Sequence, residues 1–311
     1  MIIVTGSSGY VGTRLYELLS EKFTLLGIDR KKGIYDNFIN CDLNSNYLNK
    51  KISHFLNSTN NKVSTVIHLA AARTDRATNS NVYYEDNINA TKNLLDCSNI
   101  STIKKFINVS SVAAINGKNI EINKKNLSDD DMYRYTKFKQ EQKVKRWCND
   151  NGISLVNFLP SAIFSTKQPH NTNTFRLAKF AKYSPIIFTT DTKKSLTELD
   201  NLIKNISNHI ESNQEGNVLA IEKPSLSIDQ IMNIILRKRK TPYFKFKLNE
   251  KSLLKIARFW EFPFKYTRID PIISENRVIK FFSNTEYSDI EFNLKYKSVD
   301  NIELSINKNM L

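Results

Sequence analysis

Short apolar runs alternate with amphipathic stretches through the first half of the chain. The apolar runs suit buried strands and occupy residues 1–5, 24–29, 38–43, 63–71, 105–111 and 154–160. Residues 10–22 carry apolar positions three and four apart, the spacing of one helix face, and residues 87–97 and 131–149 also predict helices. Strands and helices in alternation are typical of a parallel sheet covered by helices. The pattern therefore predicts an α/β fold.

The alternation loosens beyond Pro160. Residues 165–174 form a polar, turn-rich stretch of the kind that often lies over a ligand. Ser227-Ile-Asp-Gln230 predicts a capping box at a helix start, residues 243–247 predict a strand, and the tail from residue 289 predicts one short helix. We expect a first region of residues 1–165 and a smaller second region of residues 166–311, with a boundary that the chain can cross more than once.

A glycine-rich turn joins the first predicted strand to the first predicted helix. Its sequence is Gly6-Ser-Ser-Gly9-Tyr-Val-Gly12. Glycine permits a tight turn at the first position, close approach of a pyrophosphate at the second, and packing of helix against strand at the third. The free amides and the positive end of the helix dipole then hold the phosphates. The turn predicts a dinucleotide site.

A carboxylate at the end of the second strand bears on which dinucleotide binds. Asp29 stands 17 residues after Gly12, close to the spacing expected for a group that accepts from the ribose hydroxyls. A carboxylate there repels a 2′-phosphate, which favours NAD. Arg30, Lys31 and Lys32 follow directly and could bind that phosphate instead, so NADP is the alternative. Asp29 could also be a turn residue and no more.

Tyrosine followed by lysine four residues later suggests acid–base chemistry. On a helix both side chains face the same way, and the ammonium lowers the pKa of the phenol. The spacing occurs four times, at Tyr47/Lys51, Tyr133/Lys137, Tyr135/Lys139 and Tyr243/Lys247. Tyr47 precedes the completed dinucleotide fold and Tyr243 lies in a predicted strand. Tyr133 and Tyr135 share a predicted helix and point in roughly opposite directions.

The ordered motifs of the first half resemble those of the extended short-chain dehydrogenase/reductases, in the NAD-dependent epimerase/dehydratase group. The matching pieces are TGSSGYVG (5–12), Asp29, Asp42-Leu43, HLAA (68–71), NINATKNLL (87–95), VSS (109–111), YRYTKFKQE (133–141) and Pro-Ser-Ala (160–162). In that family Ser or Thr directly precedes the lysine, which fits Tyr133 and Lys137, whereas Phe138 precedes Lys139. The resemblance implies a Rossmann-type, doubly wound parallel sheet with a smaller C-terminal substrate-binding region.

The resemblance also implies roles for single residues. Tyr133 would be the acid/base, Lys137 would lower its pKa, and Ser111 would position the substrate oxygen, with Ser110 as the alternative. Serine at the end of a strand also caps backbone groups, and His68 in the HLAA motif is expected to be a buried structural residue. The cofactor-binding residues implied are Gly6, Ser8, Gly9, Tyr10, Val11, Gly12, Asp29, Arg30, Asp42, Leu43, Leu69, Ala70, Ala71, Asn87, Lys137 and Pro160. No metal site is expected.

Departures from the family pattern narrow the expected reaction. Ser-Ser-Val stands where sugar 4,6-dehydratases of the family carry Thr-Asp-Glu, so dehydration is disfavoured. The expected enzyme therefore uses NAD(P) to epimerise or reduce a nucleotide sugar, typically at C4, and the same residues serve both reactions. Basic residues of the second half are candidates for the diphosphate of this substrate: Arg176, Lys193, Lys194 and Arg277.

Composition bears on partners and location. Lys and Arg number 46 against 31 Asp and Glu, a formal charge of +15. The excess suits an anionic partner or reflects a Lys-, Asn- and Ile-rich composition, and a nucleic-acid-binding or cofactor-sensing protein on the same fold is the competing hypothesis. Three scattered cysteines, an N-terminus without a leader pattern and the absence of a long apolar run predict a cytoplasmic protein. A homodimer is a candidate assembly on the family resemblance.

One further stretch leaves two interpretations open. Residues 251–268 interleave apolar and basic side chains. Such a segment could lie on an anionic membrane surface as a peripheral contact. A helix packed inside the second region is the commoner outcome.

Overall fold

The structure is a computed structural model that describes residues 1–33, 35–72, 80–100, 102–120, 129–170, 172–264 and 275–310. The chain divides into two compact units. Unit 1 consists of Met1–Ile163, Thr197–Ile221 and Ile290–Ser298, and unit 2 consists of Phe164–Leu196, Glu222–Asp289 and Val299–Leu311. The chain therefore enters unit 1 three times. In the part of the chain that the structure describes, no helix is both long and apolar enough to span a membrane.

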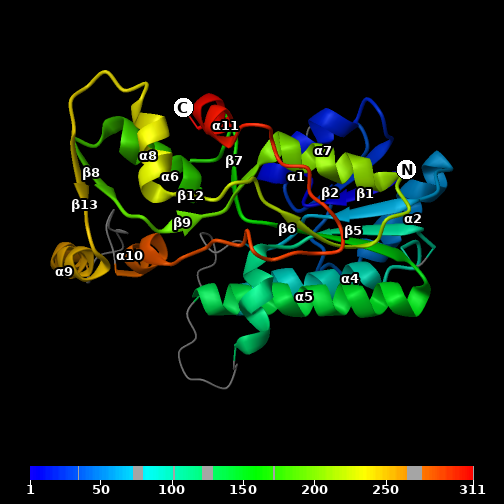
Figure 1. The fold of residues 1–311 in the computed structure, drawn as a ribbon. Coiled ribbons are helices and arrows are strands. Elements are labelled where there is room, and N and C mark those ends of the chain that lie inside the picture. The colour runs from blue at the N-terminus through cyan, green and yellow to red at the C-terminus, as the bar shows by residue number, and fades with distance from the viewer. Residues whose placement is uncertain are drawn as a thin grey trace. The chain divides into compact units, whose positions relative to one another are not determined.

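A seven-stranded sheet forms the centre of unit 1 (Figure 1). Its spatial order is β11 (Gly216–Ala220), β6 (Ser154–Pro160), β5 (Lys105–Val109), β4 (Thr65–His68), β1 (Ile2–Thr5), β2 (Leu25–Asp29) and β3 (Phe38–Asn40). All six neighbouring pairs are parallel. From β1 the chain proceeds outward to β3 on one side and through β4 to β11 on the other. This order confirms the predicted doubly wound, Rossmann-type sheet, whose ligands bind where the direction reverses, here beside β1.

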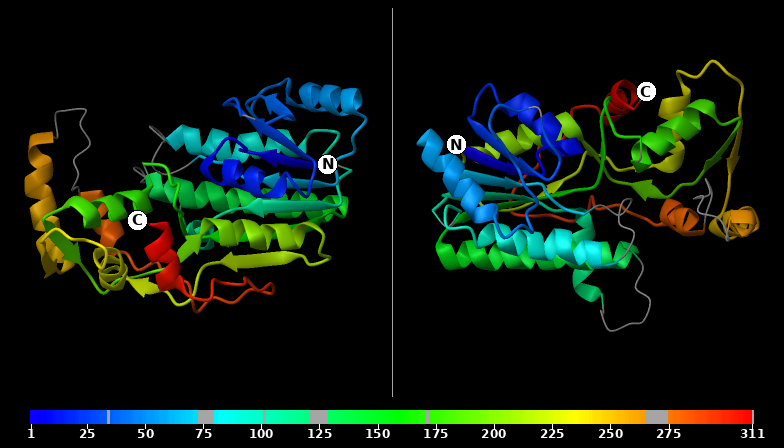
Figure 2. Two further views of the ribbon diagram at one scale, coloured as in Figure 1. Left: turned by 90° about the horizontal axis from the view of Figure 1, so that it is seen from above. Right: turned by 180° about the vertical axis from the view of Figure 1, so that it is seen from behind.

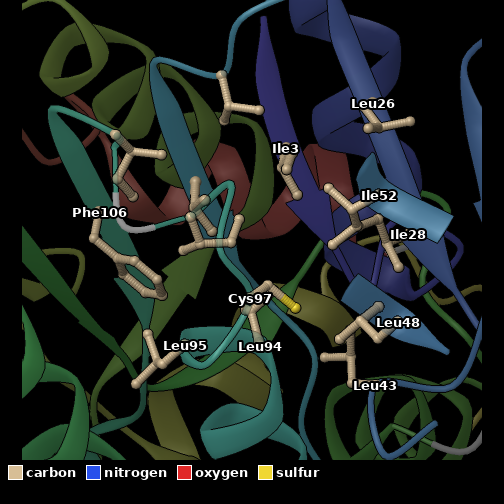
Figure 3. Close-up of a cluster of buried hydrophobic side chains, with 14 of the residues drawn as sticks. Ile3, Leu26, Ile28, Leu43, Leu48, Ile52, Leu94, Leu95, Cys97 and Phe106 are labelled. Atoms are coloured by element: carbon tan, nitrogen blue, oxygen red, sulfur yellow. The ribbon is translucent and has the colours of Figure 1, made fainter. Parts of the chain in front are cut away.

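Helices cover both faces of this sheet (Figures 1 and 2). One face carries α2 (Leu48–Thr59), α4 (Ala90–Leu95) and α5 (Asp129–Asn151). Their apolar side chains pack with those of the strands into a buried cluster that includes Ile3, Leu26, Ile52, Leu94 and Phe106 (Figure 3). The other face carries α1 (Tyr10–Leu19) and α7 (Leu199–Ile210), with a second apolar cluster beneath them. Because both faces are buried, the central strands are apolar throughout and not alternating.

Several predicted boundaries of unit 1 need correction. The predicted strands 38–43 and 63–71 extend beyond the ends of β3 and β4, so their last residues form loops at the carboxyl edge of the sheet. The predicted helix 87–97 is divided: α3 (Ser80–Tyr84) and a π-helical turn (Glu85–Asn89) precede α4. Residues 48–59, to which the pattern assigned no element, form α2. Hydrophobic periodicity marks which face is buried but does not mark where backbone pairing stops.

Unit 2 consists of short strand pairs and helices. β8 (Ile186–Thr189) pairs with β13 (Phe244–Lys247), and β9 (Lys193–Lys194) pairs with β12 (Leu226–Ser227). Helices α6 (Asn173–Tyr183), α8 (Ile228–Leu236) and α11 (Ile302–Asn309) surround one apolar cluster. Two further helices, α9 (Glu250–Glu261) and α10 (Glu275–Phe282), pack on a second. β7 (Ala162–Phe164) pairs with β10 (Leu196–Glu198).

The predicted capping box at the start of α8 is confirmed. The Ser227 hydroxyl accepts from the Gln230 amide at 3.1 Å, and the Gln230 side chain accepts from the Ser227 amide at 2.8 Å. The predicted strand at 243–247 is β13, and the predicted short helix of the tail is α11.

Candidate active site

The glycine-rich turn leads from β1 into α1. Gly6 has φ of 68°, and a Cβ there would lie 2.8 Å from the Ala70 amide nitrogen. A Cβ on Gly12 would collide with the Gly6 carbonyl oxygen. Gly9 is the N-cap of α1, and no side chain caps it. The first and third glycines are therefore required by the backbone, and α1 presents its uncapped N-terminus at the edge of the sheet, where a pyrophosphate would fit.

Asp29 fixes this turn against the end of β2. One carboxylate oxygen accepts from the Ser8 amide at 3.0 Å and the other from the Lys31 amide at 2.9 Å. Ser8 also donates its hydroxyl to the Lys31 carbonyl at 2.9 Å. Asp29 thus has the turn role that was one of its two interpretations. Each carboxylate oxygen can accept a second bond, so this role is compatible with contact to ribose hydroxyls.

Arg30 lies among carboxylates. Its guanidinium contacts Asp86 at 2.8 Å and Asp42 at 3.7 Å, and the hydrogen bond to Asp86 is the main reason that its pKa is raised. Of the three bases that could have received a 2′-phosphate, Arg30 is therefore already paired. Asp29 is also close by, so three carboxylates surround one guanidinium. The excess of negative charge disfavours the 2′-phosphate of NADP. The arrangement favours NAD over NADP.

The remaining predicted cofactor residues lie in different surroundings. Leu69 and Ala70 follow β4 directly, and their amides donate to the backbone oxygen and the hydroxyl of Thr5 at 3.2 and 3.4 Å. Leu43 is only 6% exposed and its side chain belongs to the apolar core, so its backbone alone could reach a cofactor. Tyr10, Val11 and Ala71 are half-buried, and Pro160, at the end of β6, is buried.

The four Tyr-x-x-x-Lys pairs differ sharply in burial. Tyr47 is 67% exposed and Tyr243 39% exposed. The ammonium of exposed Lys139 lies 5.4 Å from the centre of the Tyr135 ring, as in a surface cation–π pair. Lys137, in contrast, is only 2% exposed, and Tyr133 is half-buried. Of the four pairs, Tyr133/Lys137 is the one whose ammonium lies inside the fold.

Lys137 reaches the carboxyl end of β5. Its Nζ donates to the Val109 carbonyl at 3.4 Å and to the Gln140 side-chain carbonyl at 2.5 Å. Burial lowers the pKa of Lys137 to about 8, and the carboxylate of Glu141 partly opposes this shift. Burial likewise raises the pKa of Glu141, against the influence of Ser110 and Lys137. A cation that is buried four residues after a tyrosine on the same helix is suited to stabilise a phenolate on that face of the helix.

A buried polar network continues from Lys137 towards the glycine-rich turn. The Gln140 amide nitrogen lies 2.9 Å from the Thr91 hydroxyl and 3.0 Å from His68 Nε2. His68 Nδ1 lies 2.7 Å from the hydroxyl of Thr5, the residue before Gly6. Burial, with a smaller contribution from Lys137, lowers the pKa of His68 to about 3, so its ring is neutral. His68 therefore has the expected structural role, and the network connects α5 with the end of β1.

Asn87 forms a second connection, from the π-helical turn. Its side-chain oxygen accepts from the Ala72 amide at 2.7 Å, and its side-chain nitrogen donates to the Thr136 hydroxyl at 2.9 Å. Asn87 is fully buried. It therefore fixes the segment after β4 against α5, one residue before Lys137. π-helical turns are often found at functional sites, and here the turn aims the amide inward.

The two candidate serines differ in exposure. Ser110 is 6% exposed, and its hydrogen bond to Glu141 acts to lower the pKa of that carboxyl group. Ser111 is half-buried. The Ser111 hydroxyl accepts from the Ala113 amide at 3.2 Å and so caps the 3₁₀ helix Val112–Asn119. Its own O–H is a further donor. The structure thus gives Ser111 the capping role that was one of its two interpretations.

Sequence reasoning assigned no role to two residues that shape this region. Gln140 reads as one polar residue among many on a long helix, yet it is fully buried and binds Lys137. A Cβ on Gly117 would collide with the Arg134 carbonyl oxygen, so this glycine lets the 3₁₀ helix approach α5. For Gly117 the sequence did carry a signal, because a glycine in a polar loop stands next to a candidate site. For Gln140 the sequence carried no such signal.

Comparison with known families decides the assignment. The sequence pattern of the NAD dependent epimerase/dehydratase family matches residues 2–184, more than half of the chain. The chain belongs to this family. The membership confirms the resemblance inferred from the motifs.

Individual relatives agree with this assignment. An Escherichia coli O157:H7 protein, N-acetyl-α-D-glucosaminyl-diphospho-ditrans,octacis-undecaprenol 4-epimerase, is 25% identical over 241 residues, covering 74% of this chain and 70% of its own. UDP-glucuronic acid 4-epimerase from Bacillus cereus, solved with NAD, has a TM-score of 0.67 at 17% identity, covering 99% and 95% of the two chains. UDP-N-acetylglucosamine 4-epimerase from Methanobrevibacter ruminantium M1 has a TM-score of 0.68 at 20% identity, covering 99% and 96%. The two structures support the fold.

The basic residues predicted to meet a substrate lie in unit 2. Arg176 is exposed in the first turn of α6, and Lys193 pairs with Glu286 at 3.2 Å. Lys194 donates to the Ser283 carbonyl, and burial lowers its pKa to about 8. The side chain of Arg277 lies outside the described residues. Lys194 is the candidate whose surroundings differ most from those of a solvated surface base.

Proposed function

We propose that this member of the family is an NAD-dependent epimerase that inverts C4 of a sugar attached to a diphosphate. The observation that carries the proposal is the position of Lys137. Its ammonium is buried four residues after Tyr133, at the carboxyl end of β5, and a hydrogen-bonded network joins it to the strand that ends at the glycine-rich turn. A Tyr/Lys pair on the surface would not need a buried ammonium, and a purely structural lysine would not need a tyrosine four residues before it or a connection to the glycine-rich turn.

The proposed reaction assigns one task to each of three side chains. When bound, NAD supplies the oxidising and then the reducing equivalent at C4. Tyr133, as phenolate, accepts the proton of the C4 hydroxyl, and Lys137 stabilises the phenolate. Ser111 donates its O–H to the same oxygen and holds it in place. After the sugar presents its other face, Tyr133 returns the proton, so the phenol and the cofactor end as they began.

The substrate class follows from the relatives that share the family. The Escherichia coli protein acts on an N-acetylglucosaminyl group whose diphosphate is attached to undecaprenol, and the Methanobrevibacter enzyme acts on UDP-N-acetylglucosamine. Both names contain an N-acetylglucosaminyl diphosphate. We therefore propose a sugar diphosphate as substrate, carried either by a nucleoside or by a lipid, with Lys194 as a candidate contact for the diphosphate.

Product analysis tests this proposal. The purified chain is incubated with a small amount of NAD and one sugar diphosphate at a time: UDP-N-acetylglucosamine, UDP-glucuronic acid, or N-acetylglucosaminyl diphosphate on a polyprenyl chain. We expect NMR to detect the C4 epimer of at least one, without accumulation of NADH, and a deuterium label placed at C4 to remain at C4. Absence of an epimer from every substrate would contradict the proposal.

A 4-ketoreductase would use the same three residues. It would consume NADH in proportion to product and would act on the 4-keto sugar alone. The same assay, run with 4-keto sugars and NADH, therefore separates the two reactions.

A further inference from the structure

Positive charge is concentrated in unit 2. This unit holds 21 Lys and Arg against 11 Asp and Glu in 114 residues, whereas unit 1 holds 25 against 20 in 197 residues. The densest part is the stretch 237–258, which runs from the end of α8 through β13 into α9. It contains nine basic residues and one acidic residue, Glu250. A general compositional bias would have spread the excess over both units.

The β8–β13 pair carries an open apolar side. Lys245 of β13 faces α8, where its ammonium lies 3.2 Å from Asp229 and 2.8 Å from Asn233. Because successive side chains of a strand alternate, Phe244 and Phe246 lie on the opposite side, 71% and 48% exposed. The parallel register sets Phe244 beside Ile186 of β8, which is 43% exposed.

Helix α9 continues this apolar side. Leu253 and Ala257 of α9 pack with Phe188, on the same side of the β8–β13 pair, and Figure 1 shows α9 beside that pair. The outward positions are apolar as well: Ile256, Phe259 and the following Phe262 are 40%, 84% and 71% exposed. Outward apolar residues therefore occur on the helix as well as on the strands.

Two unpaired bases lie on the same helix. Lys251 and Lys255 are exposed and, among the described residues, neither takes part in an ion pair. Lys255 is one helical turn before Phe259, so an ammonium and an exposed ring are neighbours. An amphipathic helix with large apolar side chains beside lysines is the arrangement that binds at the interface of a membrane.

We propose that this surface docks the protein onto an anionic membrane. The aromatic–basic surface consists of Ile186, Phe244, Phe246, Ile256, Phe259, Phe262, Lys251 and Lys255. The rings and aliphatic side chains enter the headgroup region, and the lysines contact anionic lipid, each contributing on the order of a few-fold in affinity. A second copy of the chain is a poorer occupant, because pairing two such surfaces would bring like charges together. Single-stranded nucleic acid is also poorer: the phenylalanine rings could stack with bases, but only two lysines accompany them, whereas strand binding needs a basic groove that follows the backbone.

Membrane docking has a consequence for the substrate. A sugar diphosphate on a lipid carrier, one of the two classes proposed above, would share the membrane surface with the enzyme. This consequence rests on the proposed function, whereas the docking itself does not.

Co-sedimentation of the full chain with vesicles tests the docking without any measurement of activity. We expect the fraction bound to phosphatidylcholine vesicles that contain one-third phosphatidylglycerol to exceed that bound to pure phosphatidylcholine by at least about tenfold in partition coefficient. Phe244→Ser/Phe259→Ser and, separately, Lys251→Glu/Lys255→Glu should each reduce binding to the anionic vesicles about tenfold. Tyr47→Ser, which removes an exposed ring of unit 1, is the matched control and should leave binding unchanged. All five substituted positions are exposed, and circular dichroism checks that each variant is folded.

Three results would overturn the proposal. The first is equal binding to both vesicle types, or binding that neither double variant changes. The second is tight binding of single-stranded oligonucleotide, abolished by the same variants, without binding to vesicles. The third is self-association in light scattering that Phe244→Ser/Phe259→Ser abolishes, again without binding to vesicles.

Discussion

The two units differ most in where their large aromatic and charged side chains lie. Unit 1 buries Phe106 and Phe158 completely, together with the polar side chains of His68 and Lys137, which are fully or almost fully buried. Unit 2 leaves Phe259 84% exposed and carries most of the excess positive charge. The proposed chemistry in unit 1 therefore depends on groups whose properties are changed by burial, whereas the proposed docking by unit 2 depends on groups that face outward. Substitutions in the two units should consequently have different effects.

The sharpest form of this comparison uses one phenylalanine from each unit. Phe106→Ala removes a ring from the centre of the core and should lower the free energy of unfolding by about 3–5 kcal/mol. Phe259→Ala removes a ring that is 84% exposed and should change it by no more than about 0.5 kcal/mol. Urea unfolding followed by circular dichroism measures both. Similar losses for the two variants would contradict the contrast between the units.

Within unit 1, the glycine-rich turn should tolerate no side chain at its third glycine. A Cβ on Gly12 already collides with the Gly6 carbonyl oxygen, so Gly12→Val must displace the turn from α1. We expect the dissociation constant for NAD to rise at least about 100-fold, as a displacement of about 1 Å in a binding site can produce. Calorimetric titration measures it. Leu18→Ala, an exposed change on the same helix, should leave NAD affinity unchanged.

Gln140 tests whether the buried network positions Lys137. The activity should fall on the alkaline side of a pH profile near the pKa of Lys137, about 8, because the phenolate then loses its cation. Gln140→Leu removes the carbonyl that accepts from the ammonium. This change should lower kcat about tenfold with KM little altered and should move the alkaline limb to lower pH.

The control for Gln140 lies two residues further along the same helix. Gln142→Leu changes an exposed side chain and should move neither kcat nor the alkaline limb. If Gln140→Leu lowers stability but leaves the pH profile unchanged, Gln140 contributes to packing only and does not position Lys137.

His68 predicts a smaller, pH-dependent effect on stability. Its pKa is about 3 in the fold against 6.5 for the unperturbed ring, so the unfolded chain binds a proton that the folded chain does not. Stability from this residue is complete above pH 6.5 and falls by about 1.4 kcal/mol for each pH unit below it. His68→Gln should flatten the acid slope of the unfolding free energy by that amount. His54→Gln, an exposed change on α2, should flatten it far less, and equal slopes in all three proteins would exclude the assigned role.

The sequence predicted the regular part of unit 1 well because local pattern and global topology agree there. Six strands and the glycine-rich turn depend on residues that are close in sequence. β11 could not be found this way, because Gly216–Ala220 joins the sheet only after the chain has passed through unit 2. Its partner is set by tertiary packing, for which the local pattern gives no signal.

The site shows the same limit. Motif order identified Asn87 and Lys137 as candidates, but the partners of these side chains come from other elements. Gln140 looks like any polar residue of an amphipathic helix until the fold buries it beside His68. Leu43, predicted from its place in a motif, has its side chain in the core. Burial, which sets the pKa of the groups involved, is a property of the whole fold and is not readable from spacing.

The most direct test of the central claim compares two tyrosines on one helix. Tyr133→Phe and Tyr135→Phe each remove one hydroxyl from α5, but only the first has a buried ammonium four residues later. We predict that Tyr133→Phe lowers kcat for epimerisation by about 10²–10⁴-fold with NAD binding intact, and that Tyr135→Phe stays within about twofold of the parent. Full activity in Tyr133→Phe, or loss in Tyr135→Phe alone, would contradict the account.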